Sequence, residues 1–260
     1  MKPNTPFLVV IPARLASTRL PNKPLADIAG KPMVVRVAEQ ARKSLAQKVI
    51  VATDSTEIQA ACALHQIDCV ITRTDHLTGT DRLAEVTQLL SLKPNDVVVN
   101  VQGDEPLIPP ELINQVALTL VMHPQAAIAT AAVAIADASE ITNPHVVKVV
   151  LNQAGEAMYF SRSIIPFSRK TASDITNDAT SLPTYLRHLG IYAYRRRFLL
   201  DFVKWKQTPL ENAEKLEQLR ALEHGAKIHV VKTRTAGPGV DTPEDAAAAE
   251  KILLKSKPTK

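Results

Sequence analysis

The sequence of 260 residues is poor in cysteine, in aromatic residues and in long apolar runs, and each shortage excludes a class of protein. Two cysteines, Cys62 and Cys69, are too few for a disulfide framework, and their spacing fits no common zinc site. Aromatic residues make up 4% of the chain, which leaves few platforms on which single-stranded nucleic acids could stack. The first apolar run is too short for an export signal. We therefore expect a cytoplasmic protein.

Neither membrane insertion nor nucleic-acid binding is indicated by the charge pattern. The longest uncharged stretch, residues 112–136, contains Asn114, Gln115 and Pro124, which favour a helix, a turn and a buried strand over a membrane span. The 31 Lys and Arg residues exceed the 26 Asp and Glu residues by five, but the bases are scattered. We interpret them as a solvated basic surface with a flexible tail at residues 255–260.

The first part of the chain alternates short β-branched runs with helix-length amphipathic segments. This alternation predicts right-handed strand–helix–strand units and a mainly parallel sheet covered on both faces. Strands are predicted at residues 7–11, 48–52, 69–71 and 97–101, and helices at residues 33–44, 56–66 and 81–90.

Beyond residue 111 the rhythm changes. Two apolar runs flank a turn at residues 152–155 and predict a hairpin, which would add an antiparallel extension to the sheet. The polar segment 168–181 predicts a mobile loop. Further strands are predicted at residues 127–134, 189–194 and 227–231, and helices at residues 197–205, 210–223 and from 243 onward. With 45% hydrophobic residues, no internal repeat and no linker, the chain is predicted to form one domain over residues 1–260.

Three segments that follow predicted strands carry unusual chemistry. In open parallel sheets, ligands bind at the carboxyl ends of the strands. The first segment, residues 12–24, carries Arg14, Arg19 and Lys23, with Ser17 as a further donor, and suits a polyphosphate. It contains neither a Walker motif nor an early glycine, and a merely solvated basic loop is the competing interpretation.

The other two segments supply carboxylates. Asp104 follows the predicted strand 97–101 directly, and its position suits Mg²⁺, which takes one or two protein carboxylates. A helix-capping role for Asp104 explains the same position. In the third segment, Thr242, Pro243 and Asp245 form a typical helix start. That leaves Asp241 as a possible second metal ligand if its loop folds back over the first site.

These segments, with four others, resemble the 3-deoxy-manno-octulosonate (Kdo) cytidylyltransferase family, also called CMP-Kdo synthetases. The matching blocks occur in order and span most of the chain. They are IPARLASTRLPNKPLADIAGKPM, TDHLTGTDRLAEV, VNVQGDEPLI, YFSRSIIPF, RHLGIYAYRR, LEQLRALEHGAKIHV and GVDTPED.

The resemblance implies a fold and an activity. The fold would be the three-layer α/β/α arrangement of nucleotide-diphospho-sugar transferases, with an antiparallel extension used to form a homodimer. Residues 7–110 would be the nucleotide-binding half, and residues 111–250 the sugar-binding and dimerisation half. The enzyme would transfer CMP from CTP to the anomeric hydroxyl of Kdo, giving pyrophosphate and CMP-Kdo for lipopolysaccharide biosynthesis.

The resemblance also implies roles for single residues. Arg14, Arg19, Lys23, Asp104 and Asp241 would be catalytic, with the two aspartates binding Mg²⁺. The nucleotide would be bound by Arg14, Ser17, Arg19, Lys23, Arg73, Thr78 and Gly79. The sugar would be bound by Arg82, Gln102, Arg162, His188, Tyr192, Glu217 and Gln218.

Two alternatives remain open at this point. Asn22 and the pair Leu77-Thr78 depart from the commonest family pattern, so a related acid sugar, such as sialic acid or an amino-substituted Kdo, is a possible substrate. A non-enzymatic basic domain that binds nucleic acid is the second alternative, and it predicts salt-sensitive binding to random DNA.

Overall fold

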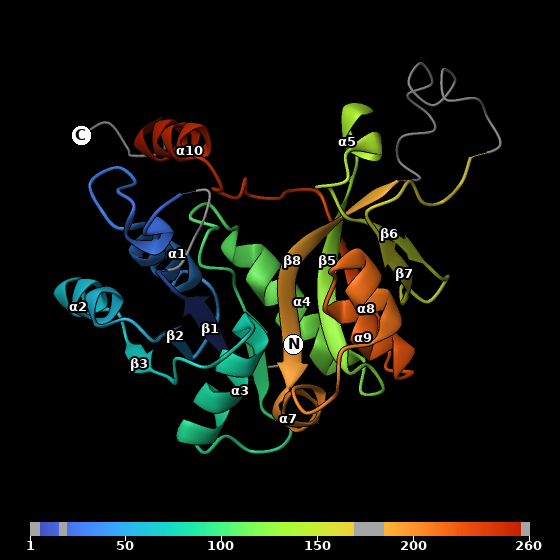
Figure 1. The fold of residues 1–260 in the computed structure, drawn as a ribbon, viewed down its shortest axis with the longest axis horizontal. Helices are drawn as coiled ribbons and strands as arrows, with labels where there is room; N and C mark the ends of the chain where they lie inside the picture. Colours follow the sequence, from blue (N-terminus) through green and yellow to red (C-terminus); the bar gives the residue numbers. More distant parts are fainter. Residues whose placement is uncertain (1–5, 16–19, 169–184, 256–260) are drawn as a thin grey trace.

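The computed structural model describes residues 6–15, 20–168 and 185–255, and nine strands within these ranges form one sheet (Figure 1). The main path of the sheet runs β3–β2–β1–β4–β8–β5–β9, and β6 and β7 join it through β8. The strands are β1 (Phe7–Ala13), β2 (Lys48–Thr53), β3 (Cys69–Ile71), β4 (Val97–Asn100), β5 (Ile128–Ala134), β6 (Lys148–Leu151), β7 (Ala157–Ser161), β8 (Leu186–Arg195) and β9 (Ile228–Thr233).

Strand directions confirm the mainly parallel sheet. Strands β1 to β4 pair in parallel, and β5 pairs in parallel with β9. Strand β8 lies antiparallel between β4 and β5, and therefore joins the strands of the two predicted halves into one sheet. All four residues of β4 are buried, as expected for an apolar run at the centre of a sheet that is covered on both faces.

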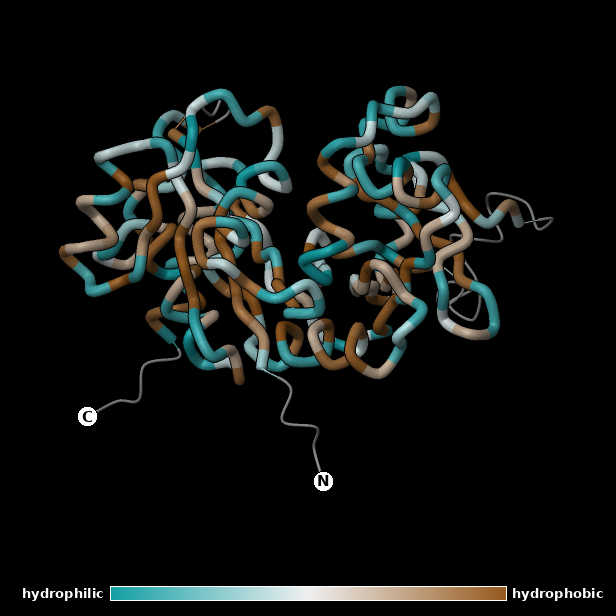
Figure 2. The backbone as a smooth tube through the Cα atoms, turned by 90° about the horizontal axis from the view of Figure 1, so that it is seen from below, coloured by the Kyte–Doolittle hydropathy of each residue, from teal (hydrophilic) through white to brown (hydrophobic). Residues whose placement is uncertain are grey.

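Helices cover both faces, which confirms the three-layer fold. On one face, Val9, Val51 and Val99 pack against α1 (Met33–Ala41), α2 (Thr56–Leu64) and α4 (Pro110–Met122). On the other face, Val10 and Val98 pack against α3 (Gly79–Leu89), α7 (Arg196–Phe202) and α9 (Gln218–Glu223). Alternate residues of β1 and β4 thus feed two separate cores. In Figure 2, brown apolar segments follow the strands, and many of the connecting turns are teal.

The prediction of one helix over residues 210–223 is wrong. The segment forms two short helices, α8 (Pro209–Glu214) and α9, which pack against each other. The break occurs at Lys215, whose φ of 54° lies in the left-handed region and ends α8. The break turns the chain, so that α9 starts with Gln218 and Leu219 buried.

The hairpin predicted around residues 152–155 is confirmed. Strands β6 and β7 pair antiparallel, and β6 also pairs with β8, so the hairpin extends the sheet as predicted. Gly155 adopts a φ of 80° in the turn. The remaining elements are η1 (Lys23–Leu25), α5 (Ser139–Thr142) and α10 (Pro243–Lys255).

Parts of two predictions fall outside the described residues. They are the loop at 168–181, from residue 169 onward, and the tail at 255–260, from residue 256 onward. Among the described helices, none has the length and apolar character needed to cross a membrane.

A buried ion pair joins α8 to α9. Glu211 and Arg220 are each 5% exposed, and the guanidinium donates to both carboxylate oxygens, at 2.8 Å from Nε and 2.5 Å from Nη2. The same guanidinium lies 4.8 Å from the centre of the Phe202 ring. Because a buried charge that loses its partner stays desolvated, this pair should matter for stability.

We predict that Glu211→Ala lowers the free energy of unfolding by about 3–5 kcal/mol, because it leaves the Arg220 charge buried without its carboxylate. Urea denaturation measures the change. Asp201→Ala is the control, since it removes an exposed pair with Lys204, and it should cost less than about 0.5 kcal/mol. Equal costs for the two variants would contradict the prediction.

Candidate active site

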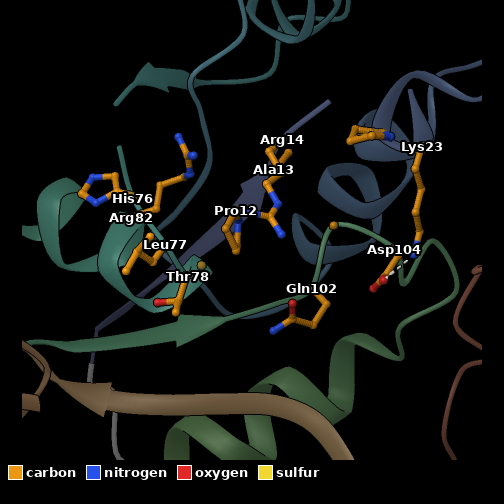
Figure 3. A pocket seen from close by; sticks show the side chains of 13 residues that line it. Pro12, Ala13, Arg14, Lys23, His76, Leu77, Thr78, Arg82, Gln102 and Asp104 are labelled. Carbon is orange, nitrogen blue, oxygen red and sulfur yellow. Dashed lines mark hydrogen bonds and ion pairs between the residues drawn. The ribbon is translucent and has the colours of Figure 1, made fainter. Parts of the chain in front are cut away.

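A pocket of about 330 Å³ opens at the carboxyl ends of β1 and β4, which are neighbouring parallel strands (Figure 3). This is the edge at which ligands bind in open parallel sheets. Three stretches of chain line the pocket: the segment after β1, the segment that leads into α3, and the segment after β4. The lining residues are Pro12, Ala13, Arg14, Lys23, Pro24, His76, Leu77, Thr78, Gly79, Arg82, Gln102, Gly103 and Asp104.

Gly103 allows the segment after β4 to lie directly on the end of β1. A Cβ atom at Gly103 would lie 2.9 Å from the carbonyl oxygen of Pro12, closer than real Cβ atoms approach. The glycine therefore fixes how Asp104, the next residue, enters the pocket. This explains why the sequence has glycine between the strand and the carboxylate.

One ammonium group holds both predicted metal ligands. Lys23 Nζ donates to Asp104 Oδ2 and to Asp241 Oδ1, each at 2.7 Å. Partial burial opposes the lysine charge, but the hydrogen bonds and charges of Asp104 and Asp241 outweigh it and raise the pKa of Lys23. The backbone N–H of Val240 also donates to the carbonyl of Asp104, so the loop before α10 lies against the first site.

The helix start at residues 242–245 has the predicted capping geometry. The N–H of Asp245 donates to Thr242 Oγ1 at 3.2 Å, and the N–H of Thr242 donates to the Asp245 carboxylate at 3.0 Å. The N–H of Asp241 also donates to the Asp245 carboxylate. The cap thus fixes the backbone of Asp241 while its side chain reaches Lys23.

The predicted nucleotide-binding residues divide into three groups. Arg14, Lys23, Thr78 and Gly79 line the pocket together. Ser17 and Arg19 lie outside the described residues. Arg73 is exposed, pairs with Asp75 at 2.9 Å, and is absent from the pocket lining, because the short-range ion pair holds its guanidinium outside.

Arg82 lines the same pocket but is already held by protein groups. Its guanidinium donates to Asp54 at 2.8 Å and to the hydroxyl of Thr72, and the residue is 3% exposed. This arrangement ties α3 to the ends of β2 and β3. Its predicted contact with the sugar stays a prediction.

Four predicted sugar-binding residues gather on β8 and at the start of α9. The rings of His188 and Tyr192 are centred 5.4 Å apart, and His188 Nε2 lies 3.0 Å from Thr130 Oγ1. Glu217 accepts a hydrogen bond of 2.6 Å from Thr80, and burial raises its pKa. Gln218, the first residue of α9, is buried beside it.

Gln102 lies between this cluster and the pocket. It lines the pocket, and its side-chain nitrogen donates to the carbonyl of Gly190 on β8 at 3.3 Å. The guanidinium of Arg162 donates to the backbone carbonyls of Glu214 and Pro144, and its predicted contact with the sugar stays a prediction.

Sequence reasoning missed three residues that the structure places at or beside the pocket. His76 and Leu77 line it, and Thr80 joins it to Glu217. All three belong to the block TDHLTGTDRLAEV, in which the resemblance assigns Thr78 and Gly79 to the nucleotide and Arg82 to the sugar. The block was therefore a signal, but spacing alone does not say which of its side chains face the pocket.

The fold and the pocket define an α/β nucleotidyltransferase, with cationic and acidic groups at the carboxyl edge of a parallel sheet. A cytidylyltransferase family model matches residues 8–228. The 3-deoxy-manno-octulosonate cytidylyltransferase of Polynucleobacter necessarius subsp. necessarius is 61% identical over 251 residues, 96% of each chain. The enzyme of the same name from Polynucleobacter asymbioticus is 62% identical over 248 residues, 95% of each chain.

Solved structures agree with these relatives. CMP:2-keto-3-deoxy-manno-octonic acid synthetase complexed with CTP superposes with a TM-score of 0.88 and 38% identity, covering 97% of this chain and 100% of that one. 4-Diphosphocytidyl-2C-methyl-D-erythritol synthase, with a TM-score of 0.61 and 12% identity, covers 96% of this chain and 98% of its own, and shares the fold alone. The chain therefore belongs to the cytidylyltransferase family, and within it to the 3-deoxy-manno-octulosonate cytidylyltransferases. The family resemblance and the enzyme class inferred from the sequence are confirmed.

We predict that His188 makes stability depend on pH. Burial lowers the pKa of His188 to about 3, whereas an unfolded histidine has a pKa near 6.5. Below about pH 6.5 the unfolded chain binds a proton that the folded chain does not, so stability is full above that pH and falls as the pH drops toward 3. The slope from this group approaches about 1.4 kcal/mol per pH unit.

Urea denaturation at several pH values between 7 and 4.5 measures this slope. His188→Gln should reduce the slope, leaving a contribution from groups such as His229, whose pKa burial also lowers. His145→Gln, at an exposed histidine, should leave it as in the wild type. A wild-type slope that survives in His188→Gln would show that the ring does not carry the effect.

Proposed function

We propose that the protein transfers CMP from CTP to the anomeric hydroxyl of Kdo, giving CMP-Kdo and pyrophosphate. The observation that carries the proposal is the meeting of Lys23 with two carboxylates at the mouth of the pocket. It occurs in a chain 61% identical to a protein named for this reaction and similar to one solved with CTP. We propose that the product serves lipopolysaccharide biosynthesis, as the family resemblance implies.

The reaction is one of positioning and charge neutralisation. The sugar hydroxyl oxygen attacks the α-phosphorus of CTP and its proton passes to solvent, the bond from that phosphorus to the bridging oxygen breaks, and pyrophosphate leaves with the electron pair. Arg14 and Lys23 line the pocket and supply positive charge for the triphosphate. Holding both reactants in line supplies much of the rate enhancement in such reactions.

We propose that Asp104 and Asp241 hold Mg²⁺. The observation that supports this metal site is that the two carboxylates already share a cation. The Lys23 ammonium nitrogen lies 2.7 Å from one oxygen of each. Mg²⁺ takes oxygen ligands, one or two of them protein carboxylates, and completes its shell with phosphate and water. Within the described part of the chain, no group of three or more His, Cys, Asp and Glu side chains is placed to hold a metal ion. A site formed by the two aspartates would therefore rely on phosphate and water for its other ligands. Bound Mg²⁺ would neutralise charge on the phosphate oxygens.

On the sugar side, we propose that His188, Tyr192, Glu217 and Gln218 bind hydroxyl groups. His188 and Tyr192 lie on β8, and Glu217 and Gln218 lie at the start of α9. Glu217 accepts a hydrogen bond from Thr80, which follows the pocket residue Gly79. Arg162 is proposed for the sugar carboxylate, since the two carbonyls it contacts use only some of its five N–H donors.

Pyrophosphate release from CTP and Mg²⁺ tests the activity, with Kdo, sialic acid and no sugar as parallel reactions. We predict release with Kdo alone. Asp104→Asn should lower the rate by at least about 100-fold, because it removes a carboxylate that would hold the Mg²⁺ whose charge neutralises the phosphates. Asp201→Asn, at an exposed position, should retain the wild-type rate. Release with sialic acid only, or no release with any sugar, would overturn the proposed substrate.

We also propose a homodimer in the cytoplasm. The hairpin face supports the dimer: a hollow of about 590 Å³ is lined mostly by apolar residues, together with the charged residue Lys232, and Met158 in this lining is 64% exposed. An apolar hollow of this kind suits a symmetric interface with a second copy. The cytoplasmic location is supported by the need for CTP and by two free cysteines.

Light scattering tests the dimer. We predict twice the chain mass for the wild type and a shift toward the single-chain mass for Met158→Lys, because a buried lysine charge at the interface is costly. Met122→Lys is the matched control, since Met122 is 68% exposed on α4, and it should remain dimeric. A wild-type protein with the mass of one chain would contradict the proposal.

A further inference from the structure

Leu77 is an apolar side chain on the lining of the pocket, where Pro12, Ala13 and Pro24 are also apolar (Figure 3). It is 83% exposed and belongs to the segment 72–78, which joins β3 to α3. Single exposed leucines are common on protein surfaces and need no explanation by themselves. What distinguishes Leu77 is how its neighbours are held.

The chain on both sides of Leu77 is tied to α3. On one side, Glu85 of α3 accepts a hydrogen bond of 3.0 Å from the N–H of Arg73, and the same oxygen lies 2.5 Å from His76 Nε2. On the other side, Thr78 caps α3, with reciprocal hydrogen bonds to Asp81. The exposed side chain is therefore carried by an ordered backbone, and little entropy is lost when a ligand packs on it.

The charges of the pocket indicate which part of a nucleotide Leu77 would meet. In Figure 3, Lys23 and Asp104 lie on one side of Arg14, and His76, Leu77 and Thr78 lie on the other, so the cations Arg14 and Lys23 attract the triphosphate away from Leu77. The nucleobase is then directed toward Thr78 and Gly79, next to Leu77. A base has flat, weakly polar faces, and a leucine buried against one gains free energy.

On its other side, Leu77 borders a hollow between α3 and α7, whose lining holds the charged groups Asp75, Glu85 and Lys204 together with the apolar residues Leu200 and Val203. The pocket side is distinguished by the neighbours of Leu77 there, because Thr78 and Gly79 line the pocket beside it.

We propose that Leu77 forms an apolar wall of the nucleobase subsite and that Glu85, acting through His76, is the positioning residue that holds it there. The inference rests on the proposed function, because it takes CTP as the ligand. It adds a packing contact that is independent of the hydrogen bonds that would read the edge of the cytosine.

Isothermal titration of CTP and of CDP into the full chain tests the contact. Leu77→Ala should weaken both ligands by the same factor, about tenfold, because the lost contact lies at the base and not at the phosphates. Arg14→Ala is the contrasting variant and should weaken CTP more than CDP. Leu64→Ala is the matched control, since Leu64 is 80% exposed on α2, and it should bind as the wild type. Both leucine variants should melt within about 2 °C of the wild type.

The outcomes separate this inference from the proposed function. A wild-type protein that binds no CTP would overturn the proposed function itself. Wild-type binding that is unchanged in Leu77→Ala would overturn only the apolar wall. A loss confined to CTP would place Leu77 at the triphosphate and would overturn its assignment to the base.

A double-mutant cycle tests the role of Glu85. Glu85→Ala should weaken CTP several-fold, and Glu85→Gln, which keeps an oxygen acceptor, should recover most of the loss. In the Glu85→Ala background, Leu77→Ala should cost clearly less than its tenfold effect in the wild type, because the wall is no longer held in place. Additive effects of the two substitutions, or no rescue by glutamine, would show that Glu85 does not position Leu77.

Discussion

The placement of one ammonium group between two carboxylates determines the rest of the pocket. Asp104 and Asp241 carry like charges, which repel at short range unless a cation lies between them. Lys23 supplies that cation, although it lies 81 residues from one carboxylate and 218 from the other. The contact therefore joins the segment after β1, the end of β4 and the loop before α10. A ligand that enters the pocket must either displace Lys23 from the two carboxylates or bind beside these three groups.

Backbone geometry brings these three segments close enough for the contact to form. Gly103 lets the end of β4 lie on the Pro12 carbonyl. Gly237 does the same for the loop before α10, because a Cβ atom there would lie 2.5 Å from the carbonyl oxygen of Leu107. Side chains at either position would push a carboxylate away from Lys23. The acidic and basic groups of the site thus depend on two residues without side chains.

Features that depend on neighbouring residues could be predicted from the sequence, and those that depend on distant partners could not. Apolar runs and caps predicted the strands of the parallel sheet and the start of α10. The left-handed residue Lys215 carries no such signal, and one long helix was expected where two form. The family block YFSRSIIPF named Arg162, but contacts with the carbonyls of Pro144 and Glu214, 18 and 52 residues away in the chain, decide where its guanidinium group lies.

The two halves of the site are joined at two points, and this constrains how the reaction can occur. Gln102 follows β4 and reaches the backbone of β8, while Thr80 of α3 reaches Glu217 before α9. Each contact links a residue at or next to the pocket to the proposed sugar-binding cluster. Glu217 also accepts a hydrogen bond of 3.5 Å from the guanidinium of Arg220. That guanidinium is itself held in place by its ion pair with Glu211. Because in-line attack requires the sugar oxygen and the α-phosphorus at a defined separation, links between rigid elements position the reactants better than flexible loops would.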